Sequence, residues 1–307
     1  MTATARRIGI LLLAGAGMLG AVPMGAQEEK EPAPSPRPPE GSVIINLPSA
    51  EVPGPGTLQF FVSHRFSQRV QGSDIHTLYS FDSAPDLGLG ISYSPLRNLE
   101  VGFGRSSLRE VYELTAKYHV LSDGALSIAV RMGEDWRTAS GQQNRSGFFA
   151  QTIAALSLGS RVRITAVPTY VSTTSGQRAY FVGQQPDGSA EFFVEPQPSY
   201  RDVFNWPVAL SVAVTGSVNI HGEVVPSYRR TVVTIPFGDA AHATVSKNSP
   251  GVGWIASIEK TVLRHRFAFT IGNLRETTVD QYVASNFLGR PHDYFFGFNL
   301  VRLWSLK

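Results

Sequence analysis

The chain has 307 residues, no cysteine, 29 glycines, 20 prolines and a formal charge of +3. The absence of cysteine excludes disulfide scaffolds, thiolate metal sites, cysteine nucleophiles and lipoproteins that are anchored through a cysteine. Arg6 and Arg7 fall in a segment that we expect to be removed, so the mature chain is nearly neutral. It therefore lacks the positive field of a nucleic-acid-binding domain, and no nucleic-acid partner is expected.

The first 26 residues have the organisation of a secretory signal peptide. Arg6 and Arg7 precede an apolar stretch over residues 8–21, and Gly25 and Ala26 supply small residues before a polar one. The apolar stretch is shorter than the ~20 residues that a membrane-spanning helix needs. We therefore predict a signal peptide over residues 1–26, cleaved after Ala26.

Residues 27–42 are rich in proline and charge, a composition that favours an extended, disordered linker. Residues 43–56, VIINLPSAEVPGPG, are apolar but do not alternate as a strand does. We expect this second segment to fold into the periplasmic mouth of the domain that follows and to plug it.

From residue 57 onward, hydrophobicity repeats with a period of two. Residues 110–121, EVYELTAKYHVL, show the pattern most clearly, because one face is apolar or aromatic and four of the five residues on the other are polar. This alternation predicts strands with one apolar and one polar face. Twelve such strands are predicted, at about 57–66, 86–94, 99–105, 110–121, 125–135, 147–158, 161–172, 203–215, 217–228, 250–259, 264–274 and 293–304.

The connections between these strands alternate between long and short. All the even-numbered ones have four residues or fewer, whereas the odd-numbered ones, except 106–109, are long. Short turns at one end and long loops at the other are typical of outer-membrane barrels. We therefore predict an all-β fold, a transmembrane antiparallel up-and-down β-barrel of twelve strands in the bacterial outer membrane, with both termini periplasmic. Ten or fourteen strands are the alternatives, because residues 76–81 could add a strand at the rim.

Several stretches of the sequence resemble an uncharacterised family of bacterial outer-membrane β-barrels, one of the domain-of-unknown-function families. This resemblance implies a barrel of unknown activity and carries over no catalytic residue. The final strand also resembles the C-terminal signal read by the barrel-assembly machinery, with Trp304 as its aromatic residue. The matching stretches are 45–66, 99–120, 168–171, 251–273 and 295–304.

If the apolar faces meet lipid, the polar faces line the lumen. The candidate lining residues carry both signs of charge, and four glycines on two neighbouring strands form a wall without side chains. They are Asp86, Gly88, Gly90, Glu100, Gly102, Gly104, Glu113, Lys117, His119, Arg131, Arg163, His221 and Glu223. The wall has two interpretations: the glycines let the barrel bend sharply, or another backbone or a substrate lies against them.

The preferred function is passive transport of a small solute through a narrow or partly plugged lumen, with selection by pore radius and paired charges. The alternative is a closed structural barrel that serves as an anchor or assembly platform for periplasmic or surface partners. Catalysis, metal binding and cofactors are not expected, because Ser63 and His64 point to opposite faces of one strand and no strand repeats a close His/carboxylate spacing. Pro168 and Pro207 are expected to interrupt neighbouring strands.

Overall fold

The computed structural model describes most of the chain after residue 40. The predicted signal peptide and most of the predicted linker lie outside the described residues. These are 41–71, 73–83, 85–107, 110–138, 145–173, 179–184, 190–194, 201–227, 233–237, 241–245, 251–283 and 294–306.

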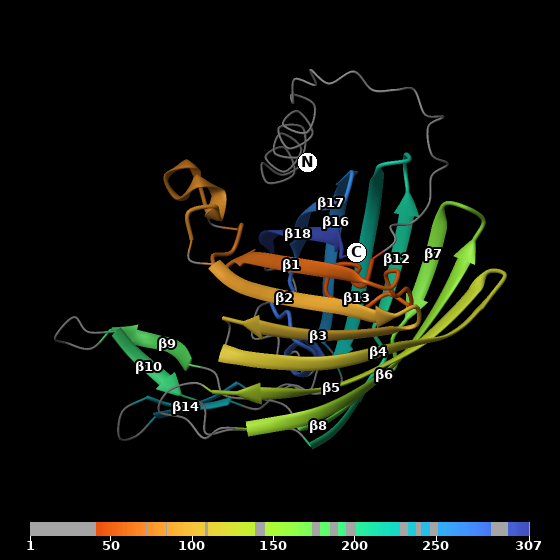
Figure 1. Ribbon diagram of the computed structural model, residues 1–307. Helices are drawn as coiled ribbons and strands as arrows, with labels where there is room; N and C mark the ends of the chain where they lie inside the picture. Colours follow the sequence, from red (N-terminus) through yellow and green to blue (C-terminus); the bar gives the residue numbers. More distant parts are fainter. Residues whose placement is uncertain are drawn as a thin grey trace. The chain divides into compact units, whose positions relative to one another are not determined.

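Fourteen of the described strands form one antiparallel sheet that closes on itself (Figure 1). In the order of their pairing they are β11 (Arg201–Asn205), β8 (Thr169–Thr173), β6 (Arg145–Leu158), β5 (Leu126–Arg137), β4 (Val111–Asp123), β3 (Leu99–Ser106), β2 (Pro85–Leu96), β1 (Thr57–Phe66), β18 (Phe295–Ser305), β17 (His265–Gly272), β16 (Gly251–Val262), β13 (Val218–Ser227), β12 (Val208–Ala213) and β7 (Val162–Ala166). Strands β6 and β7 also pair, which closes the barrel.

The predicted barrel of twelve strands is confirmed, because two of the spanning segments are each divided in two. Strands β7 and β8 are one segment interrupted at Pro168, and β11 and β12 are one segment interrupted at Pro207. The backbone groups at these breaks find partners nearby, since Val167 N–H donates to the Pro207 carbonyl (2.8 Å) and Trp206 N–H donates to Asn205 Oδ1 (2.7 Å). The interruption therefore leaves the wall continuous.

The connections differ in part from those expected. The long ones after β8 and β13 carry two-stranded hairpins of their own, β9 (Ala179–Gln184) with β10 (Ala190–Val194), and β14 (Val233–Phe237) with β15 (Ala241–Val245). Residues 76–81 do not add a strand, because most of them belong to the 3-10 helix η1 (Ile75–Ser80). The long connection before β18 contains α2 (Val279–Val283). No helix in the described part of the chain has the length and hydrophobicity to cross a membrane.

In the barrel, large apolar side chains lie on the outer surface and charged side chains lie inside, which is the reverse of their distribution in a water-soluble protein. Large apolar side chains lie on the outside, for example Leu114, which is 53% exposed, and Ile258, which is 43% exposed. Charged side chains lie inside, for example Lys117, which is only 2% exposed. Such an outer surface requires an apolar solvent, because a contiguous apolar surface of this extent is not stable in water.

The two ends of the barrel have different connections. We call the end with the turns after β2, β4, β6, β12 and β16 the short-turn end, and the other the long-loop end. Thr57 at the start of β1 pairs with Ser305 at the end of β18, so the chain enters and leaves the barrel at the short-turn end.

Candidate functional site

Residues 41–51 form a compact loop whose apolar side chains are buried. Ile44 N–H donates to the Leu47 carbonyl (2.8 Å), Ser49 N–H donates to the Ser42 carbonyl (3.0 Å), and Val43 pairs with Pro48 in an isolated bridge. Ile45 and Leu47 are completely buried. We call this loop the N-terminal segment; it includes Gly41 and Ser42, which the sequence analysis placed in the linker.

The carboxylate of Glu223, on β13, binds one side of the N-terminal segment. Three consecutive backbone N–H groups donate to its Oε1: those of Ile45 (2.7 Å), Asn46 (3.0 Å) and Leu47 (3.0 Å). Successive N–H groups that converge in this way form an anion-binding concavity. Glu223 is 1% exposed, so hydrogen bonds from these donors, rather than from water, stabilise its carboxylate.

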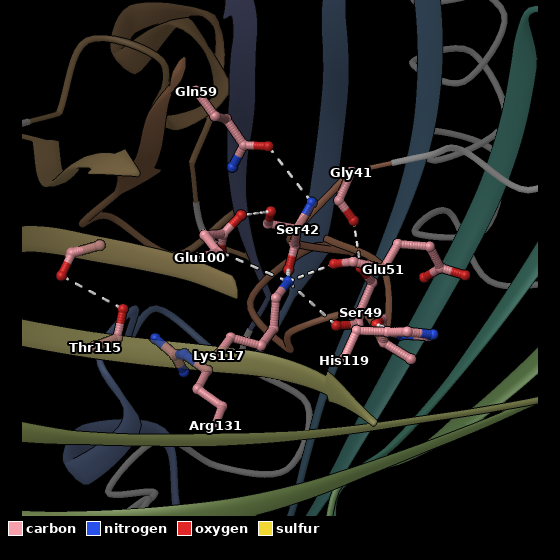
Figure 2. A network of polar contacts seen from close by, with 12 residues as sticks. Gly41, Ser42, Ser49, Glu51, Gln59, Glu100, Thr115, Lys117, His119 and Arg131 are labelled. Atoms are coloured by element: carbon pink, nitrogen blue, oxygen red, sulfur yellow. Dashed lines mark hydrogen bonds and ion pairs between the residues drawn. The ribbon is translucent and has the colours of Figure 1, made fainter. Parts of the chain in front are cut away.

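Lys117, on β4, binds the backbone carbonyl groups of the N-terminal segment (Figure 2). Its ammonium donates to the carbonyls of Glu51 (2.6 Å), Ser42 (3.4 Å) and Ser49 (3.4 Å). An ion pair with Glu100 (3.6 Å) compensates its charge. In the strand order β5, β6, β7 and β12 separate β4 from β13, so the N-terminal segment is held from two distant parts of the wall.

Further wall residues contact the N-terminal segment from other strands. They are His119 (Nδ1 to the Ala50 carbonyl, 2.9 Å), Arg163 (ion pair with Glu51), Arg266 (to the Val43 carbonyl, 3.1 Å), Asn299 (Nδ2 to the Ile45 carbonyl, 2.8 Å) and Arg65 (to Asn46 Oδ1, 2.9 Å). These residues come from β4, β7, β17, β18 and β1. Polar contacts therefore reach the segment from around the barrel.

A second segment, residues 273–283, reaches the inward-facing side chains from the long connection that follows β17. Val279 N–H donates to Glu113 Oε2 (3.0 Å) and Asp280 N–H donates to Asp135 Oδ2 (3.0 Å). The hydroxyl of Tyr282 accepts a hydrogen bond from Gln151 (2.9 Å). We call this stretch the loop segment; Tyr282, which lies within it, is 1% exposed, so its ring is buried inside the barrel.

Apolar residues of both segments belong to one buried cluster with inward-facing residues of the wall. The wall contributes Phe149 and Ile153 from β6 and Ile255 from β16, among others. The expectation that apolar wall residues face lipid therefore fails at these positions. They point inward because the two segments bring apolar side chains into the interior, and burying these surfaces together is favourable.

A cavity of about 110 Å³ lies between the two segments and the strands β2, β3 and β4. The N-terminal segment contributes Ser42, Val43, Asn46 and Pro48 to its lining, and the loop segment contributes Thr277 and Thr278. Eight of the thirteen predicted lining residues border it: Gly88, Gly90, Glu100, Gly102, Gly104, Glu113, Lys117 and Arg131.

The other five predicted residues lie elsewhere on the wall. Asp86 forms an ion pair with Arg275 of the loop segment (3.4 Å), and His119, Arg163 and Glu223 bind the N-terminal segment as described. His221 is bonded to the hydroxyl of Ser211 (2.9 Å) and lies 3.8 Å from Glu259, which also binds Arg266 (2.7 Å). This Ser-His-Glu arrangement connects β12, β13 and β16, and its serine, Ser211, is 3% exposed.

Sequence reasoning missed the loop segment and the inward aromatic Phe61. The apolar residues Leu274, Val279, Tyr282 and Val283, gathered in a connection that is otherwise polar, were the available signal for the loop segment. The alternation of β1 places Phe61 on the polar face between Gln59 and Ser63, but it gives no reason to expect an aromatic side chain in the interior at that position.

Comparisons with solved structures find distant barrels. The NanC porin is 8% identical, with a TM-score of 0.45 over 80% of this chain and 99% of that one. LpxR from Salmonella typhimurium is 11% identical, with a TM-score of 0.35 over 81% and 99%. The outer membrane protein opdK from Pseudomonas aeruginosa is 11% identical, with a TM-score of 0.33 over 72% and 57%. A comparison with curated proteins finds no match.

The family described as "Membrane bound beta barrel domain (DUF5777)" matches residues 40–304, which include the N-terminal segment and every strand of the barrel. This match confirms the resemblance seen in the sequence. The chain belongs to this family of membrane-bound β-barrel domains.

Proposed function

We propose that the protein is an outer-membrane passive channel for small polar solutes, and that the N-terminal segment closes its lumen at rest. The observation that carries this proposal is the binding of the segment from two sides, with Glu223 holding three backbone N–H groups and Lys117 holding three carbonyls. The short-turn end, where the chain enters and leaves the barrel, faces the periplasm in this proposal.

The chemistry of these contacts favours a reversible plug. Most of the contacts with the wall are hydrogen bonds to the backbone of the segment, which water can replace one by one when the segment leaves. The burial of Ile45 and Leu47 opposes release, so the closed state dominates at rest. Once the segment has left, the paired charges and the width of the lumen select the solute.

Conductance in planar bilayers tests the proposal. We expect a chain without residues 27–56 to conduct more than the mature chain, whereas removal of residues 27–40 alone leaves conductance unchanged. Equal conductance of all three proteins would overturn the plug. If the longer deletion prevents folding, Glu223→Gln weakens the same contact in the full chain and answers the same question.

A second candidate function is a closed structural barrel that anchors periplasmic or surface partners. It is supported by the loop segment, which occupies the interior independently of the N-terminal segment through Glu113, Asp135 and Gln151. A barrel of this kind shows no conductance in any of the variants above. Conductance that appears on removal of residues 27–56 excludes it.

A further inference from the structure

We propose that the cavity beside the glycine wall is a binding site for a small uncharged polyol. The inference rests on the proposed function for the route by which a solute reaches the cavity. It names the class of solute that the closed lumen holds between its two segments.

Two glycines of the wall, Gly90 and Gly104, leave space beside the cavity that a larger side chain could occupy. Gly90 on β2 and Gly104 on β3 are paired directly, and the ladder runs from Gly88 to Tyr93 in register through them. A Cβ added at Gly90 meets nothing closer than 3.8 Å, and one added at Gly104 meets nothing closer than 3.4 Å. Neither residue has a left-handed backbone, so close packing does not require glycine at these two positions, whereas a Cβ added at Gly88 or Gly102 would clash with Ser63 or Thr115.

Four of the five ionic groups around the cavity compensate one another, and the fifth, Arg105, lies over the Tyr112 ring (5.5 Å). Lys117 pairs with Glu100, and Arg131 pairs with Glu113. Arg131 also donates to Gln151, and Lys117 donates to three carbonyls of the N-terminal segment. A charged ligand finds no unpaired group of opposite sign among these four residues, so the site favours an uncharged one.

Residues on the lining also carry polar atoms without a hydrogen-bond partner. These atoms are Nδ2 of Asn46, Oγ of Ser92 and Oγ1 of Thr277, which come from the N-terminal segment, the glycine wall and the loop segment. Each of the three atoms is itself buried, so the hydroxyls of Ser92 and Thr277 meet a ligand in the cavity after a rotation about χ1 turns them toward it. A polyol matches them, because each of its hydroxyls both donates and accepts.

The remaining features set the size and shape of the ligand. Phe61 borders the cavity with Val43 and Pro48, so an apolar surface faces the C–H groups of a carbon skeleton. One water-sized probe occupies roughly 10–15 Å³, so a cavity of about 110 Å³ accommodates roughly seven to eleven non-hydrogen atoms. Xylitol, a five-carbon polyol, is within this range.

Saturation-transfer NMR with xylitol, on the full mature chain in detergent, tests the site. We expect a signal with the native protein and at least a tenfold weaker one with the double variant Gly90→Leu/Gly104→Leu, because the two side chains fill the cavity. Gly222→Leu is the matched control: an added Cβ there meets nothing within 4 Å, and the residue lies between the outward-facing Ile220 and Val224, so its signal remains native.

Three results would overturn the proposal: no signal with the native protein, an undiminished signal with the double variant, or equal or stronger binding of the xylonate anion. If the double variant does not fold, Gly90→Ala decides the question, because its methyl group fits without a clash and is expected to reduce the signal. Binding is measured here without conduction, so its loss is distinguishable from a failure of the deletion experiment, which bears on the channel alone.

Discussion

The Glu223→Gln variant probes the contact that we place at the centre of closure. The carboxylate accepts three backbone N–H groups at 2.7–3.0 Å, and its second oxygen accepts Asn46 N–H again at 3.0 Å. Glutamine has the same shape but no charge. Its amide nitrogen replaces one of the two oxygens, so a donor takes the place of an acceptor.

The size of the effect follows from the number of donors. A hydrogen bond to a charged acceptor contributes roughly 1.5–3 kcal/mol, against about 1 kcal/mol for a neutral pair. Taking the lower end of that difference, about 0.5 kcal/mol, for each of three N–H groups gives a loss of about 1.5 kcal/mol. Because 1.36 kcal/mol corresponds to a tenfold change in an equilibrium constant, release of the N-terminal segment becomes about 13-fold more favourable.

Open probability in single-channel recordings measures this change directly. Glu134→Gln is the matched control, because Glu134 lies on the exposed face of β5 between the inward-facing Gly133 and Asp135 and borders neither segment. We expect the open probability of Glu223→Gln to rise about 13-fold and that of Glu134→Gln to remain native. An unchanged open probability in a folded Glu223→Gln barrel would refute the assignment of Glu223 as the anchor of the segment.

Two further predictions concern the stability of the barrel, measured by guanidinium unfolding in lipid vesicles. Arg266→Met leaves the buried carboxylate of Glu259 without its partner at 2.7 Å, and we expect the free energy of unfolding to fall by about 3–5 kcal/mol. Most of this loss should be recovered in the double variant Glu259→Gln/Arg266→Met. Equal stability of the single and the double variant would contradict this account. Gly159→Ala, in the turn after β6 where φ is +65°, is expected to cost about 1 kcal/mol, whereas Gly54→Ala, which has an ordinary φ, costs less. Equal losses would show that backbone conformation is not the cause.

The alternation of the sequence predicted the barrel well, because a strand between lipid and a polar interior has a period of two along its whole length. In β4, Leu114 and Tyr118 point outward and Lys117 points inward, as the pattern requires. The lengths of the connections predicted which turns gather at one end of the barrel and which loops gather at the other, because each connection is read directly from the sequence between two strands. The inward positions of Lys117, Arg131 and Glu223 followed from this pattern alone.

The partners of these inward residues were beyond the reach of the pattern. The contact of Glu223 with Ile45 joins residues 178 positions apart, and no local rule connects a loop without periodicity to a particular carboxylate. The loop segment escaped for a similar reason, since α2 has only five residues and its side chains are buried by strands distant in sequence. The inward positions of Phe149 and Ile153 were not predicted, because the expectation of apolar faces toward lipid did not provide for apolar side chains inside the barrel.

The N-terminal segment also has a consequence for how the protein folds. Its contacts with Glu223, Arg266 and Asn299 join the first described residues of the chain to strands made near its end, with separations of 177, 223 and 254 residues. Contacts of such high order are entropically costly to form and slow a folding reaction. Because Asn299 lies on β18 and Arg65 lies on β1, we expect the full set of contacts with the N-terminal segment to form only after these two strands have paired. Ordering of the segment is then a late step that accompanies completion of the wall.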